Sequence, residues 1–290
     1  MFDQAEHLRL LTKQEQKLPL QAPKLLMISS GKGGVGKSNL SLNFALALQQ
    51  IGHRVLLIDA DIGFANIDVL MGIRSTHHFL QMAQSDLSIF DVMNTGPLGL
   101  KFIAGGSGFS EISYLTADQI QVLINQMSML ENQFDYIVID TGAGIQEYTL
   151  KMASIADDLL IVTTPEPTAI TDAYALIKVL VGRIQAPAIR LVVNRVASLV
   201  EGKEAADKVV LVAKKFLNTQ IQVLGYIYDD PNVQRAVMKQ QPLLLFQPNS
   251  TAAKCMQQLI RNYATGEPKE PIRRMSGNSF INKMMRLFSK

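Results

Sequence analysis

The chain has 290 residues, of which 48% are hydrophobic and 18% charged, and its formal net charge is +3. This composition suits one large α/β core with appendages. No stretch approaches the ~18 uninterrupted apolar residues of a spanning helix, and residues 1–9 lack the apolar core of a signal peptide. A single cysteine, Cys255, excludes an internal disulfide and disfavours a redox or metal-carrier role. We therefore expect a cytoplasmic protein.

The basic charge is concentrated at the end of the chain. Residues 268–290 hold six basic side chains and one acidic side chain, so the rest of the chain is slightly acidic. A slightly acidic body disfavours a general nucleic-acid binder and leaves room only for a local basic patch. We therefore expect nucleic acid to be an unlikely partner.

Residues 1–23 form a predicted N-terminal arm and linker. Residues 1–11 are compatible with a short helix that Asp3 caps and in which Ala5, Leu8 and Leu11 share one face. An isolated helix below ~12 residues is marginal in water, so this segment should dock on its own body or fold on a partner. Residues 12–23 contain two prolines among polar residues and are typical of a linker.

A glycine-rich segment follows the first predicted strand, residues 25–28, and precedes a stretch with helical apolar spacing at 39–48. From Gly31, Gly-Lys-Gly-Gly-Val-Gly-Lys-Ser matches the phosphate-loop pattern. In such a loop, backbone N–H groups and the helix N-terminus cradle phosphates, Lys37 meets the β- and γ-phosphates, and Ser38 offers its hydroxyl to Mg²⁺. The predicted nucleotide contacts here are Gly33, Gly34, Val35, Gly36, Lys37, Ser38 and Asn39.

Carboxylates follow two further predicted strands. Asp59 and Asp61 come after the predicted strand 54–58, and residues two apart in an extended segment point the same way. Asp140 ends the apolar strand 134–140 and precedes a glycine turn, as in a Walker B motif that holds a Mg²⁺-bound water. Parallel strands present their carboxyl ends at one sheet edge, so these groups predict a cation site beside the phosphate loop.

The remaining chain alternates predicted strands and helices. The strands are expected at 100–104, 158–163, 189–193 and 221–227, and the helices at 116–133, 169–181 and 205–217. Such alternation with nearly continuous apolar strands predicts a doubly wound, mostly parallel α/β sheet with helices on both faces, over residues 24–266.

Residues 267–290 are predicted to be a second linker and a C-terminal amphipathic helix. The basic Lys283, Arg286 and Lys290 lie opposite the apolar face, which fits a helix that binds an anionic membrane surface. The alternative is a helix packed on its own body or on a partner. The apolar face comprises Phe280, Ile281, Met284, Met285, Leu287 and Phe288.

The loop from Lys32, Lys-Gly-Gly-Val-Gly-Lys-Ser, resembles the deviant Walker A motif of the MinD/ParA family of ATPases. The resemblance implies binding of ATP/ADP with Mg²⁺, slow hydrolysis and an ATP-sandwiched homodimer in which Lys32 reaches the phosphates of the partner subunit. It assigns Asp61 to the attacking water and Asp59, with Ser38 and Asp140, to the surroundings of Mg²⁺. It also implies adenine contacts from two strand ends, where Tyr228 departs from the usual proline. These adenine contacts are Asn194, Arg195, Tyr228, Asp229, Asp230 and Val233.

Residues 3–9, Asp-Gln-Ala-Glu-His-Leu-Arg, resemble the N-terminal element of the MinD-like flagellar-number regulators called FlhG, YlxH or FleN. The resemblance implies that this element binds and stimulates the signal-recognition-type GTPase FlhF, with Gln4 closest to the chemistry. It also implies flagellar C-ring switch proteins as partners and reversible attachment to the inner face of the cell membrane. A MinD-type division-site regulator and a ParA-type DNA-partitioning ATPase remain alternatives. The predicted partner-binding residues are Asp3, Gln4, Ala5, Leu8 and Arg9.

Overall fold

The computed structural model describes residues 22–61, 66–105, 115–265 and 278–288. These segments include most of the predicted α/β core. The predicted partner-binding segment 3–9, most of the linker before the first strand and the linker 267–274 lie outside the described residues.

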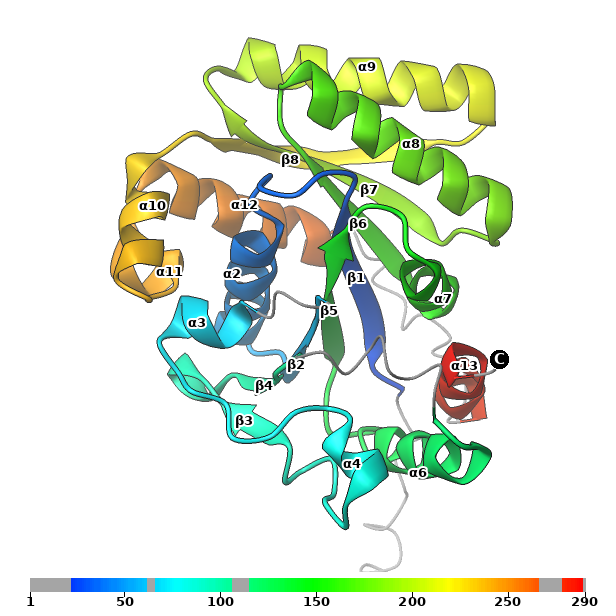
Figure 1. The fold of residues 1–290 in the computed structure, drawn as a ribbon. Helices are drawn as coiled ribbons and strands as arrows, with labels where there is room; N and C mark the ends of the chain where they lie inside the picture. Colours follow the sequence, from blue (N-terminus) through cyan, green and yellow to red (C-terminus); the bar gives the residue numbers. More distant parts are fainter. Residues whose placement is uncertain (1–21, 62–65, 106–114, 266–277, 289–290) are drawn as a thin grey trace, which may run out of the picture.

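Eight strands form one twisted sheet in the order β3-β4-β2-β5-β1-β6-β7-β8 (Figure 1). Neighbouring strands are parallel, except that the edge strand β3 runs antiparallel to β4. The predicted mostly parallel, doubly wound sheet is thus confirmed. The strands are β1 (Lys24–Ser30), β2 (Val55–Ala60), β3 (Met93–Thr95), β4 (Lys101–Ile103), β5 (Tyr136–Ala143), β6 (Asp158–Thr163), β7 (Ala188–Val196) and β8 (Ile221–Tyr228).

Helices cover both faces of the sheet because alternate strand residues point to opposite sides. In β1, Leu25 and Met27 join one buried cluster, whereas Leu26 and Ile28 join the other. The first cluster contains residues of α6 (Ala117–Ser128), α7 (Glu147–Ile155), α8 (Pro167–Arg183), α9 (Leu199–Leu217) and α13 (Asn278–Phe288). The second contains residues of α2 (Lys37–Gln50), α3 (Ile67–Met71), α10 (Pro231–Met238), α11 (Leu243–Phe246) and α12 (Thr251–Thr265). The short helices α4 (Gln81–Gln84) and η1 (Pro97–Gly99) lie in the connections.

Side-chain caps mark where two of the predicted helices begin. Thr116 and Gln119 form a reciprocal capping box at the start of α6, but this helix ends at Ser128, five residues before the predicted end. Ser198 accepts a hydrogen bond from the backbone N–H of Glu201, so α9 begins at Leu199 rather than near residue 205. Helices α7 and α10 to α12 were not predicted at all.

The C-terminal helix α13 packs on the body, beside α6 and α7 (Figure 1). Phe280 and Met284 are each 1% exposed, and the ring of Phe288 stacks on Phe79 with centroids 6.3 Å apart. Leu287 is buried too, Ile281 is partly buried, and Met285 is exposed. Most of the face predicted to enter a membrane is therefore buried in the protein, which is the alternative arrangement. No helix of the described segments is long and apolar enough to cross a bilayer.

Candidate nucleotide-binding site

The glycine loop between β1 and α2 has a backbone that few other residues could adopt. Gly34 has a φ of +80° and Gly36 a φ of +89°, both in the left-handed region. A Cβ on Gly31 would lie 2.2 Å from the backbone carbonyl carbon of Asp172, within α8. The glycines therefore let the loop curl tightly at the N-terminus of α2, where backbone N–H groups can receive an anion.

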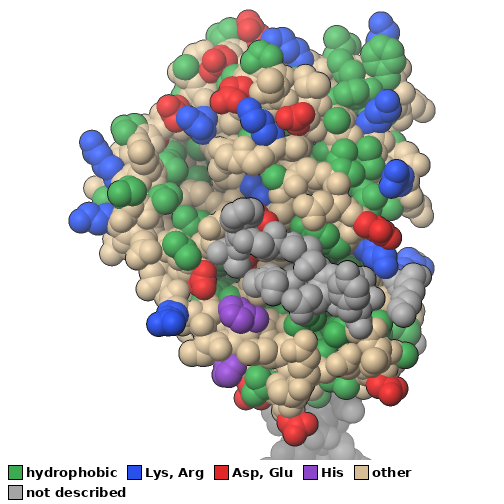
Figure 2. All heavy atoms as spheres, viewed as in Figure 1, with side chains coloured by type: hydrophobic (Ala, Val, Ile, Leu, Met, Phe, Trp, Pro, Cys, Tyr) green, Lys and Arg blue, Asp and Glu red, His purple; other side chains and the backbone are tan. Residues whose placement is uncertain are grey.

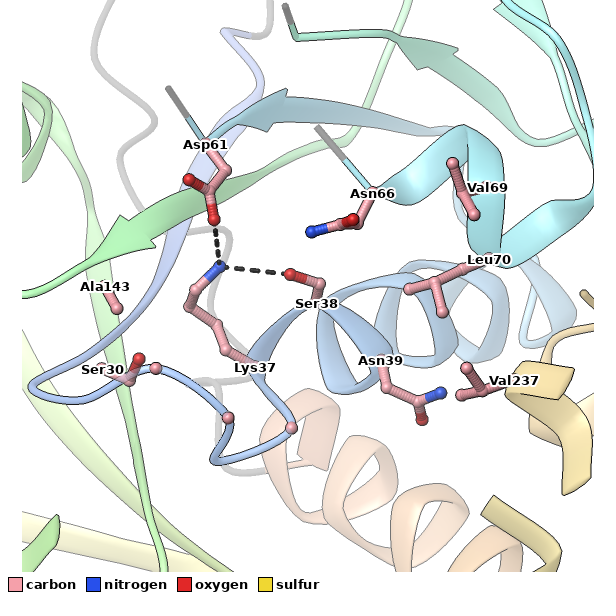
Figure 3. A pocket seen from close by; sticks show the side chains of 13 residues that line it. Ser30, Lys37, Ser38, Asn39, Asp61, Asn66, Val69, Leu70, Ala143 and Val237 are labelled. Atoms are coloured by element: carbon pink, nitrogen blue, oxygen red, sulfur yellow. Dashed lines mark hydrogen bonds and ion pairs between the residues drawn. The ribbon is translucent and has the colours of Figure 1, made fainter. Parts of the chain in front are cut away.

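A pocket of about 380 Å³ opens over this loop at the carboxyl edge of the sheet. Figure 3 shows the side chains of Lys37, Ser38 and Asp61 converging on it, with Val69, Leu70 and Val237 at its apolar end. The structure thus brings the end of β2 and the phosphate loop together, as predicted. Further lining residues are Ser30, Gly33, Gly34, Gly36, Asn39, Asn66 and Ala143.

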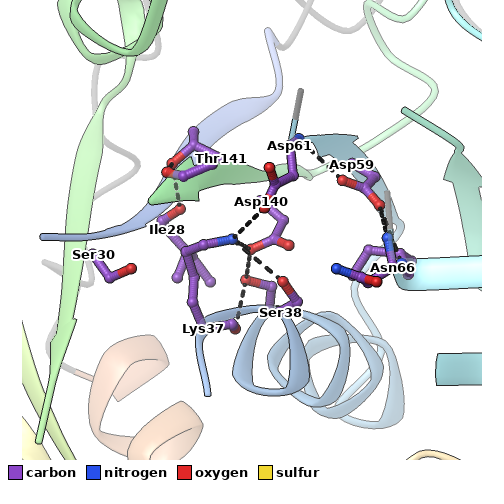
Figure 4. A network of polar contacts seen from close by, with 12 residues as sticks. Ile28, Ser30, Lys37, Ser38, Asp59, Asp61, Asn66, Asp140 and Thr141 are labelled. Carbon is purple, nitrogen blue, oxygen red and sulfur yellow. Dashed lines mark hydrogen bonds and ion pairs between the residues drawn. The ribbon is translucent and has the colours of Figure 1, made fainter. Parts of the chain in front are cut away.

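Lys37 is the centre of a buried polar network (Figure 4). Its ammonium donates to Asp140 Oδ1 at 2.8 Å and to Ser38 Oγ at 3.3 Å, and lies 3.8 Å from Asp61 Oδ2. The side chain of Lys37 is 6% exposed, so its charge is neutralised mainly by these carboxylates. A phosphate group entering the pocket would meet this lysine directly.

Asp140 has one satisfied and one unsatisfied oxygen. Its Oδ1 accepts from Lys37 and, at 2.7 Å, from Ser41 Oγ. Its Oδ2 is buried and has no hydrogen-bond partner among the described residues. Buried polar atoms normally have partners, and a hydrated divalent cation beside carboxylate and hydroxyl oxygens would supply one. Ser38 and Asp140 therefore fit Mg²⁺. The sequence analysis did not single out Ser41; its only signal was a hydroxyl four positions after Lys37, on the same face of the helix.

Asp59 organises the backbone beside the pocket. It is 1% exposed and accepts hydrogen bonds from the backbone N–H groups of Asp61, Asn66 and Ile67 at 2.9 to 3.1 Å. Burial, and then the charge of Asp140, raise the pKa of Asp59 to about 7 against these hydrogen bonds. Burial also raises the pKa of Asp61, which the nearby Lys37 charge opposes. Asp59 holds the start of α3, while Asp61 faces the pocket.

Lys32 lies apart from this network, on the outer side of the loop. Its ammonium donates to Glu166 Oε2 and to Thr168 Oγ1, both at 3.0 Å, and its side chain is 40% exposed. These two partners come from the start of α8, 134 and 136 residues later, and the sequence offered no pattern that pairs them with Lys32.

The predicted adenine contacts occupy different surroundings. Asn194 donates to the carbonyl of Val35 at 2.8 Å, and so braces the phosphate loop. Arg195 pairs with Asp229 at 3.6 Å, beside a second hollow of about 260 Å³. Asp230 is buried and caps α10 through the backbone N–H of Asn232.

Tyr228 and Val233 pack against the two opposite core clusters. They therefore lie on different sides of the sheet edge. Of the predicted adenine residues, only Asn194 contacts the phosphate loop directly in the interactions described above.

The site consists of a strand, a glycine loop and a helix, and its lysine lies between two carboxylates at the carboxyl ends of parallel strands. This arrangement defines a P-loop nucleotide-binding site. Comparison with known proteins agrees. A model for ParA, described as NUBPL iron-transfer P-loop NTPase, matches residues 21–264. The chain belongs to the ParA family of P-loop NTPases.

Two similar proteins are flagellar. The chain is 36% identical over 230 residues to the antiactivator FleN of Pseudomonas aeruginosa, covering 79% of this chain and 82% of FleN. It is 34% identical over 272 residues to the flagellum site-determining protein YlxH of Helicobacter pylori, and the match covers 91% of this chain and 90% of YlxH. The resemblance to FleN- and YlxH-type proteins is thereby confirmed.

The fold also matches a solved structure of the septum site-determining protein MinD from Pyrococcus horikoshii in complex with Mg-ADP. The TM-score is 0.67 at 23% identity, and the match covers 86% of this chain and all of that one. At this identity the match supports the fold assignment.

Proposed function

We propose that the protein is a magnesium-dependent ATPase that switches between ATP and ADP states and hydrolyses ATP slowly. The observation that best supports this proposal is that Lys37, Asp61 and Asp140 lie close together beside the glycine loop. Lys37 would turn from Asp140 to the β- and γ-phosphates, and Asp61 would hold the attacking water. Mg²⁺, when bound near Ser38 and Asp140, supplies charge neutralisation to the phosphates. The Mg-ADP in the similar MinD structure supports this assignment.

The proposed ATP-bound form is a homodimer. Among the described residues, the Lys32 ammonium is held by Glu166 and Thr168 at the surface, in an ion pair whose two side chains are 40% and 57% exposed. Exposed pairs of this kind contribute at most about 1 kcal/mol, so Lys32 can leave them for a stronger site. The phosphates bound by a second copy would be that site.

The same switch would control membrane attachment through α13. Helix α13 packs beside α7, and α7 follows the glycine turn that ends β5. The end of β5 adjoins the pocket, because Ala143 lines it and a Cβ on Gly142 would lie 3.1 Å from Asp61 Oδ1. We propose that a change at the γ-phosphate moves α7 and releases α13. Two released helices in a dimer would bind anionic lipid together, much more tightly than one.

The biological role that we propose is control of flagellar number and placement during basal-body assembly. The similarity to FleN and YlxH supports it. Residues 1–11 would stimulate an FlhF-type GTPase, with Gln4 at the contact, and flagellar C-ring switch proteins would be further partners. The proposed location is the cytoplasm, with peripheral attachment to the inner face of the cell membrane in the ATP state.

GTP turnover tests the arm directly. FlhF would be assayed alone and with the full chain, with the Gln4→Ala variant, and with a His7→Ala control, since His7 is not among the predicted partner-binding residues. We expect stimulation by the wild-type chain and by His7→Ala, and its loss with Gln4→Ala. If the wild-type chain leaves GTP turnover unchanged, the flagellar GTPase role is wrong and a MinD-type division-site role becomes the better proposal.

A DNA-partitioning role has less support from the surface. Acidic and basic side chains are both present over α8 and α9 on the face shown in Figure 2, rather than one continuous basic field. Phosphate binding along a duplex favours a continuous basic surface. Salt-dependent DNA binding by the ATP form would nevertheless establish that role.

A further inference from the structure

Ser41 is a polar side chain buried in the interior of α2, one turn after Lys37. It is 0% exposed, and its Oγ lies 2.7 Å from Asp140 Oδ1 and 3.1 Å from the carbonyl oxygen of Lys37. A hydroxyl has one proton to donate. The shorter contact is to a carboxylate and is charge-assisted, so the proton belongs mainly to Asp140.

Of the two hydrogen bonds that Asp140 Oδ1 accepts, we expect only one to persist when a nucleotide binds. Lys37 is needed by the phosphates in the proposed function, and its flexible side chain can turn toward them. Ser41 is fixed within α2 and has no such second role. When Lys37 turns away, Ser41 is the one donor described above that remains on Oδ1.

We propose that Ser41 is a positioning residue for magnesium. By occupying Asp140 Oδ1, it fixes the carboxylate so that the buried Oδ2, which has no partner in the described residues, is presented to the hydrated Mg²⁺. Hydrogen bonds of this kind behind a metal-binding carboxylate typically change metal affinity 10- to 100-fold. The inference rests on the proposed magnesium-dependent nucleotide binding and names a residue that sets its magnesium requirement.

Two matched serine variants test the proposal. Ser41→Ala removes the hydroxyl on Asp140. Ser29→Ala makes the same change at another 0% exposed serine, whose Oγ has no hydrogen-bond partner in the described residues. The fluorescence of mant-ADP bound to the full chain would be titrated with MgCl₂, and the affinity for mant-ADP would be measured separately in EDTA.

We expect Ser41→Ala to raise the MgCl₂ concentration at half-maximal effect by about 10-fold. Its mant-ADP affinity in EDTA should stay within about 2-fold of wild type, since the loop itself is unchanged. Ser29→Ala should match wild type in both titrations. If Ser41→Ala fails to fold, Ser41→Cys, with a weak S–H donor of similar shape, should give an intermediate shift.

Two results would overturn the proposal. One is an MgCl₂ midpoint in Ser41→Ala that equals that of the wild type. If Ser41→Ala does not fold, the same result in Ser41→Cys would overturn the proposal. The other is an equal loss of mant-ADP affinity in EDTA, which would show that the hydroxyl supports the loop through the Lys37 carbonyl. If wild-type protein shows no MgCl₂ effect and no mant-ADP binding, the proposed nucleotide function fails as well, so the two failures are distinguishable.

Discussion

The docking of α13 can be weakened from the body without altering α13 itself. Phe79 is 1% exposed, and its ring stacks on Phe288 with an interplanar angle of 11°. An aromatic pair contributes about 0.5 to 1.5 kcal/mol beyond the area that it buries. Because 1.4 kcal/mol is tenfold, the loss of this pair term alone should raise the undocked population of α13 by about 2- to 12-fold, and the apolar area lost with the Phe79 ring adds to it.

Hydrogen exchange of the amides in residues 278–288 measures how often α13 undocks. Sedimentation with anionic vesicles in the ADP state measures how much protein then binds the membrane. We expect faster exchange in α13 and more vesicle-bound protein for Phe79→Ala. The control is Phe102→Ala, which removes a 0% exposed ring from the core cluster on the opposite face of the sheet. Equal exchange in α13 for the two folded variants would show that the effect follows from a general loss of stability and not from the contact between Phe79 and Phe288.

Two aspartates at the carboxyl edge of the sheet, Asp230 and Asp61, can be tested by substitution. Asp230→Ala should lower the free energy of unfolding by about 1 to 2 kcal/mol in urea, because α10 loses its cap. Burial raises the pKa of Asp230, but donors at Ala252 and Asn232 outweigh it and hold the pKa below its usual value. This stabilisation is therefore present above the unfolded pKa of about 3.9, and its loss as the pH falls further should make variant and wild type converge. Asp61→Ala should abolish ATP turnover yet keep mant-ATP binding, and loss of binding would contradict the assigned role.

Local patterns were enough to predict the centre of the site. Lys37 and Ser38 follow from the spacing within the loop, and Asp61 and Asp140 follow because parallel strands end at one edge. Contacts between segments far apart in the sequence could not be predicted from local patterns. Ser41 meets Asp140 across 99 residues, and Lys32 meets Glu166 across 134, with no local pattern that encodes either pair.

Not every missed helix lacked a local signal. The buried side of α12 recurs at helical spacing, at Ala252, Met256, Leu259 and Tyr263, so the apolar pattern alone was enough to indicate a helix there. For α13, the amphipathic pattern correctly predicted a helix with one apolar face. The pattern specifies that this face avoids water, but the choice between lipid and protein depends on the surface available in the body.

In the proposed switch, ATP joins two copies of this chain. The oligomeric state of the full-length Asp61→Ala variant, in which turnover is blocked, can be measured by sedimentation velocity with saturating ATP and MgCl₂. We expect a dimer with ATP, a monomer with ADP, and a monomer with ATP when Lys32→Ala is added. If the variant stays monomeric with saturating ATP and MgCl₂, ATP does not join two copies and the proposed switch is wrong.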